Sequence, residues 1–571
     1  MPGGLAPITF APSGQANGGK PYWQWDYKNF APRLAIAYSP HADSGWLRSL
    51  LGGAGKSSIR LGYGLYYDHF GEGLVNTFDR NGSFGLTTTE TNPYGYQDVD
   101  CSYRFSGLFT LPQGTYCDQD MNGAPPGPFP VTPPSGVNAP GGFAIYWGMD
   151  DKLKTPYSHA FDFSFTRDLG RSFSLEVAYV GRLGRHLLQE TDLGMPEDIR
   201  DPKSGMDYFT AATMFSKMAN AGTDVSQVAP IPYWENIFPS AAGGGLTATQ
   251  AMYQLFAANL DDEIVALQYA DTSCYPACST LPGQSAPTAY NFFMPQFSSL
   301  WGWRTSGNSS YNALNVTLRH AFSAGVQFDV NYTYSKSIDV GSNAERINVF
   351  DTNGGNVGGF SSQVINSWQP NQLRAVSDYD MQHQINSNWI VELPFGRGRK
   401  FGSGMGSFAN AVLGGWSASG LFHWTTGLPF SIFPGGGWST NYNLEGEAIE
   451  IANPGPVGVH MDAQGNPTMF ANPTAAIADF RHPYPGEGGE RNELRGPGYF
   501  GIDTGLGKEW NFKEDKTVKF DWEVFNLTNA VRFDAANASN DFDLTSSTNF
   551  GVYDSTLTKP RVMQFSLRFG F

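Results

Sequence analysis

Strict alternation of apolar and polar residues recurs along this chain and constrains its fold more than any other feature. In one stretch, Val326, Phe328 and Val330 alternate with Gln327 and Asp329. An alternation of period two places successive side chains on opposite faces of a β-strand, whereas a helix would show a period near 3.6. The sequence therefore predicts a strand with one apolar face and one polar face.

Eleven stretches of this kind can be read along the chain, and the connections between them alternate in length. The predicted strands are 32–40, 57–68, 157–168, 171–182, 311–322, 324–337, 384–395, 414–427, 499–510, 516–527 and 560–571. Most of these strands fall into consecutive pairs, and a short or moderate connection joins the two strands of each pair. Long connections separate the pairs, and these are 69–156, 183–308, 338–381, 428–498 and 528–559. Short turns at one end of a sheet and long loops at the other are typical of outer-membrane β-barrels.

Composition supports strands that cross a membrane. Charged residues make up only 15% of the chain, aromatic residues another 15%, and there are 68 glycines. Strands of about 9–11 residues can cross a bilayer at a tilt, whereas no apolar run here is long enough for a membrane-spanning helix. We therefore predict an all-β fold: an antiparallel transmembrane β-barrel, or a partial barrel of about 11–12 strands, with long extracellular loops.

The two faces of the predicted strands suggest two environments. The polar residues expected to face the lumen are Arg319, Gln327, Asp329, Lys519, Asp521, Glu523 and Arg568. They would line a transport path or pack against a plug. Aromatic residues near strand ends are expected in the interfacial girdles of a barrel, and these are Tyr66, Tyr67, Trp389, Trp424 and Trp510.

Several classes of function are disfavoured by the sequence. A formal net charge of −16 argues against a nucleic-acid-binding protein, which normally carries a basic face. The chain has no HExxH, no Walker loop, no GxSxG and no GxGxxG in a βαβ setting. The nine histidines are scattered. We therefore expect no catalytic residues and no enzymatic activity.

The long connections contain the chain's cysteines and one acidic motif. The cysteines form two local pairs, Cys101 with Cys117 and Cys274 with Cys278. Their spacing fits disulfides in an oxidising compartment and lacks the clustered pattern of a zinc site.

The acidic motif comprises Asp118, Asp120 and Asn122, followed by Gly123, and it matches the opening of a Ca²⁺-binding loop. The twelfth position would be Phe129 instead of Glu, which excludes an EF-hand. An isolated Ca²⁺ site in a surface loop is one interpretation, and a solvated turn is the other. No other cofactor is expected.

An ordered set of segments resembles the TonB-dependent transporter family, in its Oar-like branch with very long surface loops. The segments are 29–40, 59–68, 175–188, 311–339, 377–401, 413–432 and 520–533. The resemblance runs from about residue 29 to the last residue and leaves 1–28 as an N-terminal extension. It implies an outer-membrane barrel of a Gram-negative bacterium that admits a ligand when TonB pulls on a plug.

The final strand also resembles a known signal. Phe565, Leu567, Phe569 and the terminal Phe571 share one face, which we expect to meet lipid. A terminal aromatic residue on such a strand resembles the signal by which outer-membrane proteins are handed to the barrel assembly machinery. Expected partners are therefore this machinery, membrane lipid and lipopolysaccharide, with no nucleic acid.

The chain also departs from the family pattern. A signal peptide, a TonB box and a plug are not recognisable, and eleven strands are about half of the family's usual twenty-two. If the C-terminus lies on the periplasmic side, an odd number of strands places the start of the 32–40 strand outside the cell. A further strand at 82–90 would make the number of strands even. We therefore expect the C-terminal half of a longer receptor, with TonB as a partner only if a plug lies upstream. Its expected function is uptake of a bulky nutrient, such as an oligosaccharide or peptide-like molecule. The alternatives are a plugless barrel for surface binding or adhesion, and a passive pore.

Overall fold

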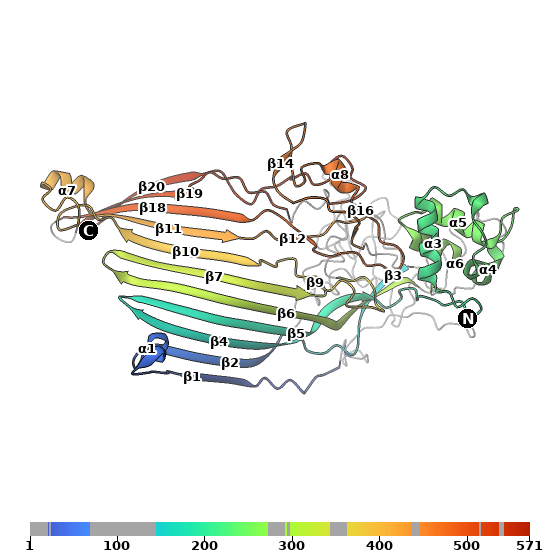
Figure 1. Ribbon diagram of the computed structural model, residues 1–571, viewed down its shortest axis with the longest axis horizontal. Coiled ribbons are helices and arrows are strands. Elements are labelled where there is room, and N and C mark those ends of the chain that lie inside the picture. The colour runs from blue at the N-terminus through green and yellow to red at the C-terminus, as the bar shows by residue number, and fades with distance from the viewer. Residues whose placement is uncertain are drawn as a thin grey trace, which may run out of the picture.

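A large antiparallel sheet dominates the computed structural model (Figure 1). The structure describes residues 21, 24–68, 144–271, 292–293, 297–342, 363–435, 446–512, 516–535 and 542–571. Eleven strands of this described part follow one another across the sheet. They are β1 (Arg33–Tyr38), β2 (Ser57–Tyr67), β4 (Tyr157–Gly170), β5 (Phe173–Asp192), β6 (Phe297–Ser323), β7 (Val326–Asp339), β10 (His383–Glu392), β11 (Trp416–Thr425), β18 (Tyr499–Asn511), β19 (Thr517–Phe525) and β20 (Val562–Gly570). The eleven predicted strands are thereby confirmed.

The two ends of the sheet differ in how the strands are connected (Figure 1). At the end that we call the turn end, the connections are tight turns or carry the short helices α1 (Gly45–Leu51) and α7 (Ser407–Leu413). Ala324 and Gly325, with φ angles of 53° and 80°, close the β6–β7 hairpin as a type I′ turn requires. The long connections leave from the opposite end, the loop end. The chain finishes at the turn end, as the sequence predicts for a C-terminal strand.

The register of strand pairing assigns the side chains to two faces that continue across all eleven of these strands. Directly opposed residues share a face, so the pairs can be followed from β1 to β20. What we call the polar face includes Asp162, Ser164, Glu176, Asn315, Thr317, Asn331, Asn386, Asn388, Ser417, Ser419 and His423. What we call the apolar face includes Ile59, Leu61, Phe161, Phe163, Val177, Leu318, Phe328, Val330, Trp389, Phe422, Leu506, Phe520 and Trp522.

Two cations on the apolar face lie at the turn end. Arg167 donates from Nη1 to the carbonyl oxygen of Leu51, at the end of α1, over 2.7 Å. Lys508 donates from Nζ to the carbonyl oxygens of Asn410 and Gly414, at the end of α7. The C-terminal carbonyls of a helix lack partners within the helix and attract cations. The short helices therefore provide hydrogen-bond acceptors for charges that would otherwise face an apolar surface.

β5 and β6 are longer than the sequence predicted. They contain 20 and 27 residues, which at about 3.3 Å per residue corresponds to roughly 66 and 90 Å. Residues 183–192 and 297–308, predicted as parts of a loop, therefore belong to strands that continue past their neighbours (Figure 1). The register shifts between Arg185 and Leu187, where His186 has a φ of 53°. Such an irregularity breaks the period of two, and this explains why the alternation was not recognised there.

The connection between β5 and β6 contains a helical segment with its own core. Its described part includes α3 (Tyr208–Asn220), η4 (Val225–Gln227), α4 (Pro232–Ile237), η5 (Pro239–Ala241), α5 (Ala248–Ala258) and α6 (Glu263–Asp271). Phe215 stacks on Trp234 with ring centroids 4.7 Å apart and an interplanar angle of 8°, and both side chains are fully buried. A capping box between Thr247 and Gln250 fixes the start of α5. Sequence analysis described this region only as a long loop.

A second cluster, which we call the loop cluster, joins the connections that follow β11 and β19. It contains α8 (Pro473–Ile477) and the short strands β12 (Pro429–Phe430), β13 (Ile449–Glu450), β14 (His460–Met461), β15 (Pro467–Thr468), β16 (Phe480–Arg481) and β17 (Leu494–Arg495). Phe470 and Phe550 stack in its core with ring centroids 5.6 Å apart. Three further short strands, β3 (Ala144–Met149), β8 (Gln363–Val364) and β9 (Ala375–Val376), pair with the main sheet. Within the described ranges, no helix is both long enough and apolar enough to cross a membrane.

Candidate functional site

The polar face contains every residue that the sequence suggested for the lumen. Arg319, Gln327 and Asp329 lie on β6 and β7, while Lys519, Asp521, Glu523 and Arg568 lie on β19 and β20. The structure therefore brings these residues to one face, in two groups separated by three strands. That this face meets a lumen remains a prediction.

Within each group, charged side chains have partners on the same strand or on a neighbouring one. Arg319 donates from Nε to Asp329 Oδ1 over 2.6 Å, and Gln564 donates from Nε2 to Glu523 Oε2 over 2.5 Å. Lys519 forms an ion pair with Asp521 at 3.1 Å. Exposed ion pairs contribute little to stability, typically about 0–1 kcal/mol. The pairs therefore shape a hydrated surface with charges of both signs more than they hold the sheet together.

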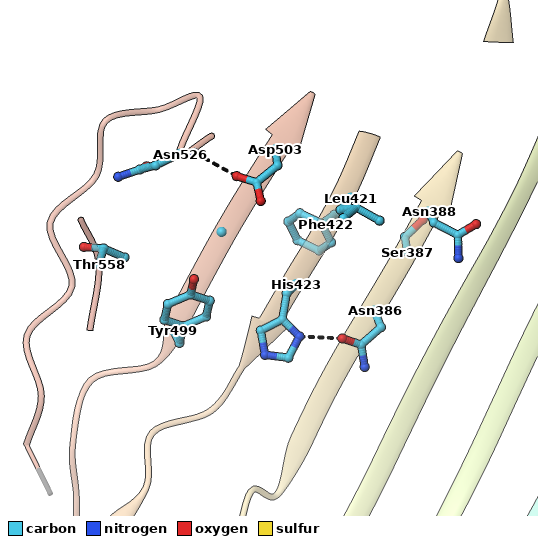
Figure 2. Close-up of a pocket in the computed structure, with 11 residues that line it drawn as sticks. Asn386, Ser387, Asn388, Leu421, Phe422, His423, Tyr499, Asp503, Asn526 and Thr558 are labelled. Atoms are coloured by element: carbon cyan, nitrogen blue, oxygen red, sulfur yellow. Dashed lines mark hydrogen bonds between the residues drawn. The ribbon is translucent and has the colours of Figure 1, made fainter. Parts of the chain in front are cut away.

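The loop-end half of the polar face carries a pocket of about 310 Å³ (Figure 2). It lies over β10, β11 and β18, and the segments after β19 close one side. Its lining residues are Asn386, Ser387, Asn388, Leu421, Phe422, His423, Tyr499, Gly501, Asp503, Asn526 and Thr558. Sequence analysis did not identify this pocket, because its residues come from five separate parts of the chain.

The polar groups of this pocket are held in place by hydrogen bonds and ring packing. His423 donates from Nδ1 to the Oδ1 atom of Asn386, and its ring lies 5.5 Å from that of Tyr499 (Figure 2). Asp503 Oδ1 accepts from the backbone N–H of Asn526 over 2.7 Å. In the neutral tautomer that donates from Nδ1, the Nε2 atom of His423 is a hydrogen-bond acceptor.

Glycine at position 501 leaves space for the Tyr499 side chain in this pocket. Gly501 is opposite His423 in the strand register, and a Cβ atom there would lie 2.8 Å from the Tyr499 hydroxyl. The missing side chain therefore keeps space between the two rings. The pocket can offer amide, hydroxyl, imidazole and carboxylate groups around an aromatic ring, which suits binding of a polar ligand. Within the described residues, no group of three His, Cys, Asp or Glu side chains could hold a metal ion.

Near the loop end of the sheet, a buried arginine joins two long connections, one between β7 and β10 and the other between β11 and β18. Arg491 donates from Nη1 to Asp339 Oδ1 over 2.8 Å and from Nη2 to Asp378 Oδ1 over 2.5 Å. Its Nη2 also donates to Ser342 Oγ over 3.0 Å. Arg495 forms a second ion pair with Asp380. These contacts attach the connection between β11 and β18 to the end of β7 and to the segment that precedes β10.

The remaining predicted residues fall into three groups. Phe565, Leu567 and Phe569 lie on the apolar face of β20, and together with Phe571 they are exposed at the surface of the chain. The disulfide candidates Cys101, Cys117, Cys274 and Cys278 lie outside the described residues. The calcium candidates Asp118, Asp120 and Asn122 and the further strand suggested at 82–90 lie outside them as well.

One of the residues predicted for the aromatic girdles lies on the polar face. Tyr67, Trp389, Trp424 and Trp510 lie on the apolar face, as expected for girdle residues. Tyr66 instead lies on the polar face opposite Ser158, where the guanidinium of Arg33 sits 4.5 Å above its ring. Adjacent strand residues point to opposite faces, so Tyr66 and Tyr67 could not both face lipid.

Comparison with known protein families identifies the class of this chain. The family described as outer membrane beta barrel domain matches residues 5–564. The chain belongs to this family, and it is therefore a β-barrel protein of the outer membrane. A comparison with curated proteins gave no match.

This chain resembles parts of solved structures of outer-membrane receptors and transporters. The outer membrane transporter YddB from Escherichia coli is 10% identical, with a TM-score of 0.33, over 90% of this chain and 38% of that one. A mutant of the ferric enterobactin receptor PfeA from Pseudomonas aeruginosa is 9% identical, with a TM-score of 0.33, over 94% and 40%. The ferric-catecholate import receptor Fiu from E. coli is 8% identical, with a TM-score of 0.29, over 90% and 33%. This chain therefore spans about two fifths or less of each of these structures.

Proposed function

We propose that this chain is the barrel portion of a TonB-dependent transporter that takes up a bulky nutrient, such as an oligosaccharide or a peptide-like molecule. The observation that carries the proposal is the polar face, which continues across eleven described strands and bears a hydrogen-bonding pocket at its loop end. A face of this kind suits the passage of a polar solute along the inside of a barrel. The opposite, apolar face suits contact with lipid.

The chemistry of the pocket supports a polar ligand with several hydrogen-bonding groups. Asn386, His423 and Asp503 supply amide, imidazole and carboxylate groups, and Tyr499 supplies an aromatic ring. Polar groups placed around an aromatic surface can orient a sugar or a peptide unit. A small inorganic ion would be too small to contact all of these groups at once.

The proposed partners follow from the two faces and the final strand. Membrane lipid and lipopolysaccharide would contact the apolar face, and the barrel assembly machinery would recognise β20. TonB would act through a plug domain, as the resemblance of segments such as 311–339 and 377–401 to the TonB-dependent family implies. TonB is a partner in this proposal only together with such a plug.

A second candidate function is surface binding without transport. The helical segment and the loop cluster favour it, because each has its own hydrophobic core at the loop end. Such folded units could present a binding surface even if no solute crossed the barrel. A passive pore is a third possibility that the experiment below separates from the other two.

Uptake by cells with and without TonB tests the proposal. Cells that produce the protein would be supplied with labelled oligosaccharides and oligopeptides in matched strains that have or lack TonB. We expect accumulation of one ligand class that requires TonB and that falls at least tenfold in an Asp503→Asn variant. Asp162→Asn, on the same face but remote in register, serves as the matched control. Binding without accumulation would favour the second candidate, and equal accumulation in both strains would favour the pore.

A further inference from the structure

Two short helices at the turn end of the sheet expose apolar side chains instead of burying them (Figure 1). Neither α1 nor α7 contains a buried residue. In α1, Trp46 and Leu50 are 74% and 51% exposed, and in α7, Phe408 and Val412 are 84% and 49% exposed. The members of each pair are four residues apart, so they share one side of their helix. Both helices therefore have an apolar side that the described part of the chain leaves uncovered.

Side chains from the apolar face of the sheet hold these helices. Trp416 donates from Nε1 to the carbonyl oxygen of Val412 over 2.8 Å, and Trp510 donates from Nε1 to that of Ala411 over 2.7 Å. Both tryptophans belong to the apolar face, as does Arg167, which holds the end of α1. Outer-membrane barrels turn their apolar face to lipid and their short connections to the periplasm. With this arrangement, both helices lie at the periplasmic edge of the surface that meets lipid.

The connection that contains α7 is basic, although the chain as a whole is acidic. It spans residues 393–415 and includes Arg397, Arg399 and Lys400 but no acidic residue. The formal net charge of the whole chain is −16. Arg399 forms an ion pair with Glu392 on β10 at 2.7 Å. The other two cations add positive charge close to α7.

Arg397 and Lys400 carry charges that no carboxylate compensates within the described ranges. Arg397 donates from Nε to the carbonyl oxygen of Met405 over 2.7 Å and from Nη2 to Ser407 Oγ over 3.1 Å. Lys400 Nζ lies 5.5 Å from the centre of the Phe401 ring. Both cationic residues are exposed, so an anion can reach them.

α1 repeats this combination of groups in the β1–β2 hairpin. Arg48 is exposed and donates from Nη1 to the carbonyl oxygen of Asp43 over 2.7 Å, and no described carboxylate forms an ion pair with it. Exposed apolar side chains beside a cation are typical of a helix in a membrane interface. There the hydrocarbon enters the acyl region and the cation stays near the lipid phosphates.

A phospholipid leaflet fits this surface better than a protein partner does. Anionic headgroups complement the uncompensated cations, and the acyl region continues the lipid expected at the apolar face. The two helices also belong to separate hairpins, with β4, β5, β6 and β7 between them in the sheet. A membrane contacts both hairpins at once, whereas a small protein would reach one of them.

We propose that α1 and α7 insert their apolar sides into the periplasmic leaflet of the outer membrane, where Arg48, Arg397 and Lys400 bind the phosphates of anionic phospholipids. The two helices would hold the turn end of the sheet at a fixed depth in the membrane. This inference rests on membership in the outer-membrane barrel family and does not depend on transport.

The depth of insertion can be measured with a fluorophore on single cysteines at 46 and 408. The full chain, with its four native cysteines replaced by serine, would be placed in vesicles of phosphatidylglycerol and phosphatidylcholine. Part of the lipid would carry a nitroxide quencher on the upper acyl chain. We expect quenching at 46 and 408 to be at least threefold stronger than at 464, an exposed position in the loop cluster. Equal quenching at all three positions would overturn the insertion.

The preference for an anionic headgroup can be measured by native mass spectrometry of the full chain in detergent micelles. Phosphatidylglycerol is compared with phosphatidylcholine of the same acyl chains, and we expect at least fivefold tighter binding of phosphatidylglycerol. Replacing Arg397→Gln and Lys400→Gln together should weaken that binding at least fivefold and change phosphatidylcholine binding less than twofold. The matched control is Arg200→Gln with Lys203→Gln, which removes two exposed cations before α3 and should change either affinity less than twofold.

Three results of these measurements would overturn the headgroup site. The first is equal affinity for the two lipids, or an unchanged affinity for phosphatidylglycerol in the folded double variant, with folding checked by circular dichroism. The second is displacement of phosphatidylglycerol by millimolar inorganic phosphate, because the cations would then bind the free anion. The third is a dimer in detergent that Phe408→Ser converts to a monomer, because a second copy would then cover α7. The labels at 46 and 408 give an answer even if the double variant fails to fold.

Discussion

Replacement of Arg491 by methionine tests how the long connections are held at the loop end of the sheet. The Arg491 side chain has no exposed surface and donates to Asp339 and Asp378. Methionine is similar in length but carries neither charge nor N–H groups. The substitution therefore leaves two carboxylates facing a position that can no longer neutralise them.

The expected cost follows from the burial of the two partners. Removal of one member of a buried ion pair typically costs about 3–5 kcal/mol, because the remaining charge is left without compensation. The Asp339 side chain is 4% exposed, but that of Asp378 is 25% exposed and can regain water. We therefore expect the lower end of that range, ~3 kcal/mol. This corresponds to an increase of roughly 10²-fold in the locally open state, since a factor of ten is about 1.4 kcal/mol.

Amide hydrogen exchange on the purified full chain measures this local opening. Peptides from 446–498 and 363–380 should exchange roughly 10²-fold faster in Arg491→Met, whereas β19 and β20 should be unchanged. Arg481→Met is the matched control, because Arg481 and Glu487 are 26% and 39% exposed and such a pair contributes less than about 1 kcal/mol. Exchange in Arg491→Met no faster than in Arg481→Met would refute the reasoning.

Three further predictions concern the helical segment and the final strand. Burial raises the pKa of Glu263 from 4.5 to about 7, so the unfolded chain loses this proton first. Stability of the helical segment should therefore fall by ~3 kcal/mol as the pH rises from about 4.5 to 7. Glu263→Gln should remove this pH dependence in thermal melts, and an unchanged profile would contradict the assignment. Phe215→Ala should destabilise the same segment by ~3–5 kcal/mol through loss of the buried ring against Trp234. Faster amide hydrogen exchange confined to α3–α6 would support this prediction, and exchange equal to that of the wild type would contradict it. Phe571→Ser should reduce the fraction of heat-modifiable folded barrel in outer membranes, whereas Phe512→Ser, at an exposed turn, should not. Equal fractions for the two variants would exclude a signal at the terminal residue.

The strands and their two faces could be predicted from the sequence because both depend on local patterns. In 324–337 the alternation is strict, and Ala324 and Gly325 supply the backbone that the turn requires. The polar residues of β19 and β20 could be assigned to one face for the same reason. Where the period breaks, as at His186 on β5, the prediction ended too early.

The helical segment left a readable signal that sequence analysis did not use. The buried residues of α3 include Tyr208, Ala211, Ala212 and Phe215, which have the spacing of one helix face. The capping box at Thr247 is also visible as a pattern of residue types. A search for a helical period inside the long connections would have found both.

The pocket on the polar face and the arginine network could not be predicted from local patterns. Arg491 is 152 residues from Asp339 and 113 residues from Asp378 in the chain. His482 and Asp261 likewise lie 3.5 Å apart, although long stretches of chain separate them. Such contacts depend on how distant connections fold against each other, and nothing in the spacing of the individual residues encodes them.

The central claim, that one face of this sheet meets lipid and the other meets water, is tested most directly by cysteine scanning of β19. In a background with the four native cysteines replaced by serine, single cysteines at each position of 518–523 would be spin-labelled in outer-membrane vesicles. We predict that oxygen, which dissolves in lipid, increases the relaxation rate of labels at 518, 520 and 522. A water-soluble nickel complex should increase the relaxation rate of labels at 519, 521 and 523. The same accessibility at all six positions, or the opposite phase, would contradict the account.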